Sequence, residues 1–217
     1  MSPDQLFKAV VQVAVLLFAV SVHESAHGWV ALRCGDTTAR DLGRISLNPL
    51  RHVDPVGSIL VPALLAFTGA PVFGWAKPVP VSLHGVRNPR RANLLIAAAG
   101  PVSNLVVALA FGAVLLLLRP FLREVEPGSF AVPLLLVAVF SVVVNVSLAL
   151  FNLVPIPPLD GFGVLESLLP ARAYPAVQLL RRYGFVILVV IVFTGVLGRL
   201  LGPVQALLVH GLLGGIL

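Results

Sequence analysis

Long apolar runs without any charged residue dominate the pattern of hydrophobic and polar positions in this chain. Four such runs cover residues 92–118, 131–159, 183–198 and 200–217, and another apolar stretch precedes Arg33. A helix needs ~20 apolar residues to cross the ~30 Å hydrocarbon core of a bilayer. The pattern therefore predicts an all-α polytopic membrane protein with about five to six membrane segments.

The same runs predict how the chain is organised. Three core helices are expected at about residues 5–33, 91–118 and 131–160, and one or two C-terminal helices at about 183–217. No repeat, low-complexity tail or separate soluble segment interrupts this pattern. Residues 1–217 are therefore expected to form a single integral-membrane domain.

Two stretches depart from the helical pattern. Residues 55–76 have a short apolar centre that includes Pro62, which suits a re-entrant or tilted segment better than a full crossing. Residues 73–81, FGWAKPVPV, should be extended, because their two prolines exclude a helix. A short hairpin is expected within residues 37–47, which are polar and punctuated by glycine.

Composition and charge point to the lipid bilayer and exclude a nucleic-acid partner. The chain is 58% hydrophobic and 11% charged, and its net charge of +6 comes from short loops between apolar runs. Eleven of the fifteen basic residues fall within 33–51, 77–91 and 172–182. Basic loops of this kind stay cytoplasmic. If all three basic loops are cytoplasmic, the loops before and after residues 55–76 lie on the same side, so this segment cannot cross the membrane a single time. The first helix then starts outside the cytoplasm, where the N-terminus lies.

The stretch VAVLLFAVSVHESAHGWVAL, residues 13–32, is apolar enough to cross a membrane yet carries His23, Glu24 and His27. Histidines four residues apart share one face of a helix and can bind one Zn²⁺, with the glutamate beside them as a general base. A charge near the bilayer centre costs ~3 kcal/mol, whereas structural zinc sites return ~10 kcal/mol or more. Metal binding is therefore favoured over the alternative, a structural polar patch packed against another helix.

Catalytic zinc usually takes three protein ligands, so a further buried side chain is needed. Asp160 stands out, because it ends a long uncharged run and follows three prolines that prevent a regular helix. Gly161 then permits a tight turn that could aim the carboxylate inward. The alternative role for Asp160 is a helix cap. His52 and Asp54 are rival ligands, although both lie in a polar loop where a charged or polar side chain needs no special explanation.

Three motifs carry a family resemblance. HESAH at residues 23–27, GPVSN at 100–104 and NLVPIPPLDG at 152–161 resemble the site-2 protease family of intramembrane zinc metalloproteases. The segments RHVDP and FGWAKPVPV are similar to the short branch of that family, which lacks a PDZ domain. The resemblance extends over about residues 5–200.

This resemblance implies one zinc per chain, with His23, His27 and Asp160 as ligands and Glu24 as general base. It also implies that Asn152 polarises or holds the scissile carbonyl, and that the three core helices form the catalytic core. The expected substrates are transmembrane helices of other proteins, cleaved within or near the bilayer. The expected location is a bacterial or archaeal cell membrane, with the active site toward the cytoplasmic side.

Other readings stay open at this point. Asn152 could instead make an interhelical hydrogen bond worth ~1 kcal/mol. Asn104 carries the same ambiguity, and a structural or substrate-clamping role is favoured for it. A membrane metal-handling protein, either a transporter or a zinc chaperone, would use the same ligands but would not need Glu24. The pattern contains no indication of an oligomeric state.

Overall fold

The computed structural model describes residues 2–68, 74–122, 126 and 129–214. All regular secondary structure in this part of the chain is helical. Five helices are long and apolar enough to cross a membrane, which confirms the all-α polytopic class. They are α1 (Pro3–Arg33), α4 (Pro89–Leu122), α5 (Ala131–Asn152), α7 (Tyr174–Phe193) and α8 (Val196–Leu213).

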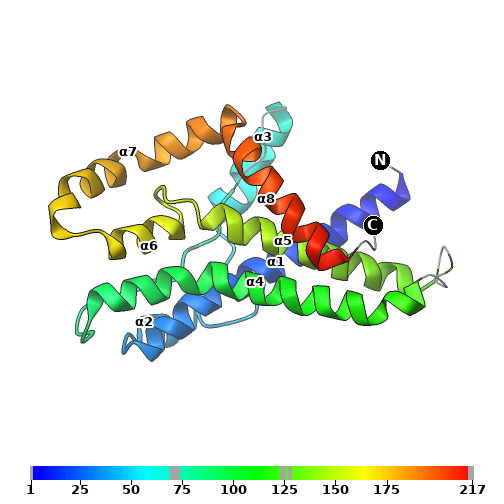
Figure 1. Cartoon of the computed structure of the whole chain (residues 1–217), viewed down its shortest axis with the longest axis horizontal. Coiled ribbons are helices and arrows are strands. Elements are labelled where there is room, and N and C mark those ends of the chain that lie inside the picture. Colours follow the sequence, from blue (N-terminus) through cyan, green and yellow to red (C-terminus); the bar gives the residue numbers. More distant parts are fainter. Residues whose placement is uncertain (1, 69–73, 123–125, 127–128, 215–217) are drawn as a thin grey trace.

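Helices α1, α4 and α5 pack against one another and form the core of the molecule (Figure 1). Buried alanines contribute to their contacts beside larger aliphatic side chains, and small residues of this kind are usual where membrane helices approach closely. The fully buried alanines of these helices are Ala19, Ala31, Ala108 and Ala149. Large apolar side chains such as Leu117 and Phe121 point away from the core and are mostly exposed. An apolar exterior of this kind is suited to lipid.

The third core helix is shorter than expected, because α5 ends at Asn152 and Asp160 begins a separate helix, α6 (Asp160–Leu168). The irregular residues between them contain Pro155, Pro157 and Pro158, which deny backbone hydrogen bonds to a continuous helix. Gly161 permits the tight fold-back of α6, since a Cβ there would clash with the backbone of Leu153 and Val154.

Hydrogen bonds join the two ends of the segment at residues 55–76, of which residues 69–73 lie outside the described residues. A π-helical turn, Pro55–Leu60, continues into α3 (Val61–Thr68). The Trp75 backbone N–H donates to the Gly57 carbonyl at 3.1 Å, and Ser58 Oγ donates to the Trp75 carbonyl at 2.9 Å. The two ends of the segment therefore lie together, as expected for a re-entrant element and not for a single crossing.

The expected hairpin at residues 37–47 is wrong. These residues form the short helix α2 (Thr38–Asp41) followed by turns around Gly43, which has a φ of +62°. Residues 74–83 form neither a helix nor a strand, while Phe73 lies outside the described residues. The prolines that exclude a helix here also remove the N–H groups that a strand ladder would need.

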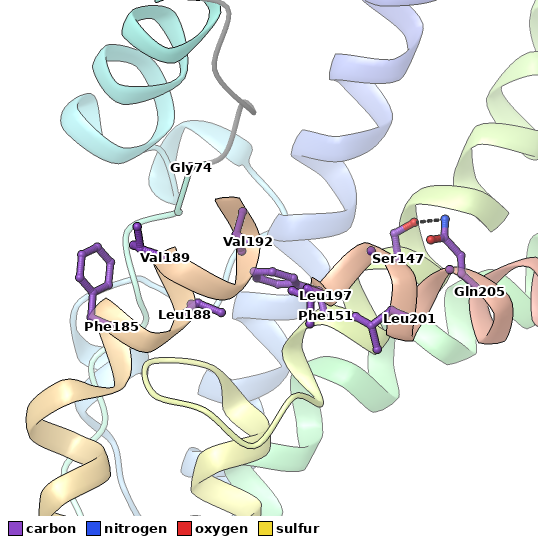
Figure 2. Close-up of a pocket in the computed structure, with 12 residues that line it drawn as sticks. Gly74, Ser147, Phe151, Phe185, Leu188, Val189, Val192, Leu197, Leu201 and Gln205 are labelled. Carbon is purple, nitrogen blue, oxygen red and sulfur yellow. Dashed lines mark hydrogen bonds between the residues drawn. The ribbon is translucent and has the colours of Figure 1, made fainter. Parts of the chain in front are cut away.

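An apolar cavity of about 340 Å³ lies among α5, α7 and α8 (Figure 2). Phe151, Leu188 and Leu197 are among its lining residues. At its edge, Gln205 Nε2 donates to Ser147 Oγ at 2.9 Å and so ties α8 to α5. None of His23, His27 and Asp160 lines this cavity.

Candidate active site

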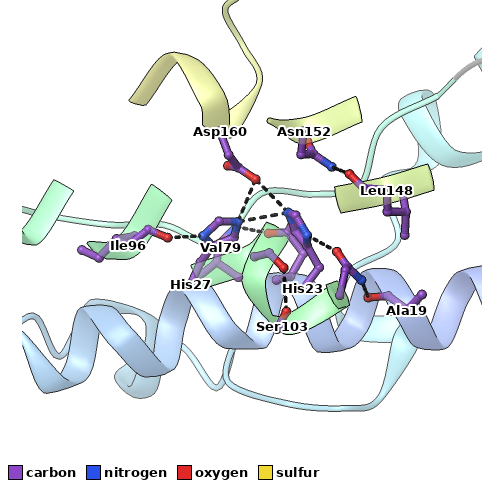
Figure 3. A network of polar contacts seen from close by, with 12 residues as sticks. Ala19, His23, His27, Val79, Ile96, Ser103, Leu148, Asn152 and Asp160 are labelled. Atoms are coloured by element: carbon purple, nitrogen blue, oxygen red, sulfur yellow. Dashed lines mark hydrogen bonds and ion pairs between the residues drawn. The ribbon is translucent and has the colours of Figure 1, made fainter. Parts of the chain in front are cut away.

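Helix α1 places His23 and His27 on one face, one turn apart and both buried. Their Nε2 atoms are 3.1 Å apart. Asp160, at the first position of α6, points its carboxylate between them (Figure 3). Asp160 Oδ2 lies 3.0 Å from His23 Nε2 and 3.3 Å from His27 Nε2. Residues far apart in the sequence thus bring three potential ligand atoms to one point.

Hydrogen bonds at Nδ1 decide which nitrogen of each histidine faces this point. His27 Nδ1 lies 2.6 Å from the Ile96 carbonyl, which can only accept, so Nδ1 carries the proton. His23 Nδ1 lies 2.6 Å from Asn104 Oδ1. The Asn104 amide nitrogen is occupied by Asn145 Oδ1 at 2.7 Å, so its oxygen faces His23. In the neutral imidazoles, both Nε2 lone pairs therefore point at Asp160.

This arrangement fits a divalent cation of the zinc type. Three atoms that can only accept a proton or bind a metal lie 3.0–3.3 Å from one another. Asp160 Oδ2 is buried and has no hydrogen-bond donor in the described structure. Ligand atoms ~2.1 Å from a tetrahedral zinc are ~3.4 Å from each other, a few tenths of an ångström more than here. Without a cation, the facing lone pairs would repel one another.

Gly100 on α4 leaves the space that this site needs. A Cβ at this position would lie within 2.5 Å of His23 Nε2 and would also clash with His27 Nε2. Ser103 Oγ donates to the Gly100 carbonyl at 2.7 Å, one turn back in the same helix.

Glu24 is half-buried on α1 beside the histidines. Its Oε2 accepts a hydrogen bond of 2.9 Å from the backbone N–H of Val79. Val79 belongs to the irregular residues 74–83, and its side chain packs over Gly28, one turn further along α1. The irregular segment thus lies alongside the face of α1 that carries the glutamate.

Two anchors hold this segment in place. The Lys77 N–H donates to the His52 carbonyl at 2.9 Å, and the Ser82 N–H donates to Asp36 Oδ2 at 2.7 Å. Partial desolvation by itself would raise the pKa of the Asp36 carboxyl. Hydrogen bonds from the Thr38 side chain and backbone and from the Ser82 N–H stabilise the charged carboxylate and have the larger effect. The pKa of Asp36 is therefore lowered from its ordinary value.

Helix α4 also supports the helix that presents Asp160. Asn93 Nδ2 donates to the Gly163 carbonyl at 3.2 Å and to Ser167 Oγ at 2.9 Å. Arg90 Nε donates to the Ser167 carbonyl at 2.6 Å near the C-terminal end of α6. These bonds fix the axis of a helix only nine residues long.

The rival ligands have other partners. His52 is buried, and its Nε2 lies 2.7 Å from the Ser46 carbonyl, away from the His23 site. Asp54 caps the π-helical turn by accepting from the backbone N–H groups of Val56 and Gly57. The helix-cap alternative for Asp160 also fails, because Leu159 occupies the cap position and no side chain caps α6.

Asn152 is half-buried at the C-terminal end of α5, close to the site in Figure 3. Its Nδ2 donates to the Leu148 carbonyl of its own helix at 3.0 Å. No hydrogen bond joins it to the histidines or to Asp160 in the part of the chain that the structure describes. The structure thus places Asn152 near the site, bonded to its own helix.

The structure identifies supporting residues that the sequence left ambiguous or did not single out. Asn104 has the structural role considered for it, because it holds His23 through Oδ1. Asn145, which holds Asn104, was not singled out, although an amide inside a long uncharged run was a signal. The backbone groups of Val79 and Ile96 have no signature in the sequence, since every residue carries an N–H and a carbonyl except proline, which lacks the N–H.

Comparison with known proteins finds relatives described as zinc metalloproteases, in agreement with the zinc-type ligand geometry of the site. The model of peptidase family M50 matches residues 11–194. "Putative zinc metalloprotease YwhC" of Bacillus subtilis is 37% identical over 88% of this chain and 84% of its own length. A protein of Mycolicibacterium smegmatis with the same description, Rip2, is 32% identical over 86% of this chain and 68% of its own length.

A more distant relative is "Regulator of sigma-E protease RseP" of Salmonella typhimurium, 33% identical over 52% of this chain and 27% of its own length. No solved structure matches the chain significantly. The family match covers most of the chain, including the helices that carry the two histidines and the aspartate. The chain therefore belongs to peptidase family M50, the site-2 protease family, and is a membrane zinc metalloprotease.

Proposed function

We propose that this protein is an intramembrane protease that hydrolyses peptide bonds within or near transmembrane helices of other membrane proteins. In this proposal one zinc ion per chain is held by His23, His27 and Asp160. The observation that carries the proposal is the meeting of three potential ligand atoms inside the helical core. Two of them come from α1, a helix long enough to span a bilayer, and the third comes from the short helix α6. Ionisable groups at such positions are expensive and are functional as a rule.

Glu24 is the general base of the proposed reaction. Bound zinc would act as a Lewis acid that polarises the scissile carbonyl and lowers the pKa of water at the site. Glu24 accepts the proton of the attacking water and passes it to the leaving amine. The Val79 N–H holds Oε2 of Glu24, so the other carboxylate oxygen is available for the proton.

Asn152 is proposed to stabilise the oxyanion of the tetrahedral intermediate. An asparagine amide has two N–H groups, and the Leu148 carbonyl occupies one of them. The second can donate to the substrate without adding a buried charge. Removal of one such donor typically lowers kcat by ~10²–10³-fold.

Asn152→Ala should therefore keep its zinc and its fold but cleave a transmembrane test substrate far more slowly. Asn152→Asp should do no better, because a negative charge opposes the developing oxyanion. Cleavage rates are compared at matched expression and zinc content. Near-wild-type cleavage by Asn152→Ala would reduce this residue to a helix contact.

The central experiment compares wild type with Glu24→Gln, each reconstituted in liposomes with a single-pass test substrate. Zinc content is measured by mass spectrometry of the metal, and cleavage by fragment analysis. Glu24→Gln should keep zinc and lose cleavage, because the ligands are untouched and the base is removed. Glu166→Gln is the matched control, since Glu166 pairs with Arg181 outside the site.

The same experiment separates a protease from a membrane metal carrier. A carrier would keep both metal and metal transport after Glu24→Gln, since transport does not need a general base. Full cleavage by Glu24→Gln, or wild-type protein that binds no zinc, would contradict the proposed function.

A further inference from the structure

Arg44 is a buried arginine with no carboxylate partner among the described residues. Its residue is only 9% exposed, and its Nε is buried without a hydrogen-bond partner in this part of the chain. Its Nη2 donates to two successive backbone carbonyls, those of Lys77 at 2.7 Å and Pro78 at 3.4 Å. Burial of an unpaired cation is costly, so its placement against these two carbonyls needs an explanation.

The second carbonyl belongs to the same peptide group as the N–H that holds the general base. The Pro78 carbonyl faces Arg44, and the Val79 N–H of that peptide donates to Glu24 Oε2. The peptide group therefore lies between a guanidinium and a carboxylate. A cation at the carbonyl side polarises the peptide and strengthens its N–H as a donor.

We infer that Arg44 is a positioning residue for the general base. It fixes the Lys77 and Pro78 carbonyls so that the Val79 N–H holds one oxygen of Glu24 in a constant orientation. This inference rests on the proposed role of Glu24 in proteolysis. Arg44 itself touches neither the substrate nor the three metal ligands.

The rest of the segment has anchors of its own. The Lys77 N–H is bonded to the His52 carbonyl, and the Ser82 N–H is bonded to Asp36. Loss of the Arg44 side chain should therefore loosen the peptide next to Glu24 without detaching the whole segment. This is why the effect should fall on catalysis and not on folding or metal binding.

The test uses Arg44→Met, which keeps an apolar stem and removes every donor. We expect unchanged zinc content, unchanged KM and a kcat about tenfold lower, the factor that corresponds to loss of one well-placed hydrogen bond. Arg44→Lys, which keeps a cationic donor, should recover part of the kcat. Arg51→Met is the matched control, because Arg51 donates at 2.8 Å to the Gly43 carbonyl in the same loop.

A second measurement does not depend on cleavage. Hydrogen–deuterium exchange of the full-length protein should show faster exchange of the peptide that contains Val79 in Arg44→Met, but not in Arg51→Met. If the wild type cleaves no substrate, the proposed function fails, yet exchange still tests the contact between Arg44 and this peptide.

A double-mutant comparison tests the path through Val79. Val79→Pro removes the N–H, and Val79→Ala controls for the lost side chain. Adding Arg44→Met to Val79→Pro should cause no further loss of kcat, because the linking hydrogen bond is already absent. Additive losses, a raised KM with unchanged kcat, zinc loss in Arg44→Met, or an equal loss in Arg51→Met would each overturn the inference.

Discussion

At the scale of single residues, the site depends on which atom of each side chain faces the metal position. The i, i+4 spacing places His23 and His27 on one face but leaves either ring nitrogen free to point inward. The Ile96 carbonyl and Asn104 Oδ1 remove that choice by binding Nδ1 of each ring. Such partners of ligating histidines typically change metal affinity by 10–100-fold when they are lost.

Asp160→Ala should lower zinc occupancy strongly, because it removes one of three ligands. His52→Ala is the comparison, since His52 is also a buried histidine but bonds the Ser46 carbonyl. Zinc content per chain, measured on purified protein, should stay near wild type in His52→Ala. The ligand assignment is wrong if His52→Ala strips the metal and Asp160→Ala keeps it.

Gly100→Ala should also reduce zinc binding, although Gly100 has no ligand atom. The added methyl group would occupy the space beside both Nε2 atoms and push the rings or α4 apart. Gly198→Ala in α8 is the matched control, since a Cβ there meets nothing within 4 Å. Equal zinc affinities for the two variants, from competition with a chelating dye, would show that α4 can move aside at no cost.

At the scale of elements, two short irregular pieces present the chemistry to the long helices. The proline-rich break before α6 turns Asp160 toward α1, and residues 74–83 bring the Val79 N–H to Glu24. A regular helix cannot do this, because its backbone groups are already bonded to one another. The long helices form the rigid frame of the site, and the irregular pieces orient the Asp160 carboxylate and the Val79 N–H toward α1.

The attachment of residues 74–83 should weaken in acid through Asp36. Its pKa is lowered in the folded protein, so its stabilising effect is complete above the ordinary carboxyl pKa of ~3.9. The effect is lost as the pH falls through the lowered pKa. Hydrogen exchange corrected for intrinsic rates should show residues 79–83 opening below about pH 4.

Asp36→Asn should show this opening already at neutral pH, because a neutral amide binds the Ser82 N–H more weakly. Asp41→Asn is the control, since Asp41 is exposed and bonds only its near neighbours Thr37 and Arg40. An identical response in the two variants would mean that Asp36 does not anchor the segment.

At the scale of the whole molecule, the position of the basic loops matches the topology expected from their charge. The loops after α1, before α4 and before α7 gather at one end of the molecule, and the N-terminus lies toward the other (Figure 1). The hydrogen bonds between Trp75 and residues 57–58 close the segment that contains α3. We therefore propose that all three basic loops lie on the cytoplasmic side.

Cysteine labelling tests this topology in a background that lacks Cys34. Leu50→Cys and His84→Cys should react with an impermeant reagent from the same side of the membrane. His84 is chosen because the neighbouring Gly85 has a φ of +80°, which a cysteine would strain. Phe130→Cys, at the start of α5, should label from the opposite side. Labelling of positions 50 and 84 from opposite sides would reject the re-entrant topology.

The sequence by itself was sufficient for the membrane helices, the histidine–glutamate motif and Asp160 as the favoured third ligand. These features depend on rules that act over short stretches of sequence. They are the length of apolar runs, the 3.6-residue period of the helix and the inability of proline to continue a helix. The end of α5 and the hairpin at 37–47 were misjudged, because the exact end of a helix and the conformation of a polar loop depend on what packs against them.

Only the tertiary structure decided how the site is held together. His23 meets Asn104 across 81 positions of sequence, and Glu24 meets the Val79 N–H across 55. Backbone N–H and carbonyl groups recur along the whole chain, so no residue pattern marks the few that bind a catalytic side chain. The backbone groups that bind a catalytic side chain are selected by helix packing. At Gly28 and Gly100 the absence of a side chain lets segments that are distant in the sequence approach each other closely around α1.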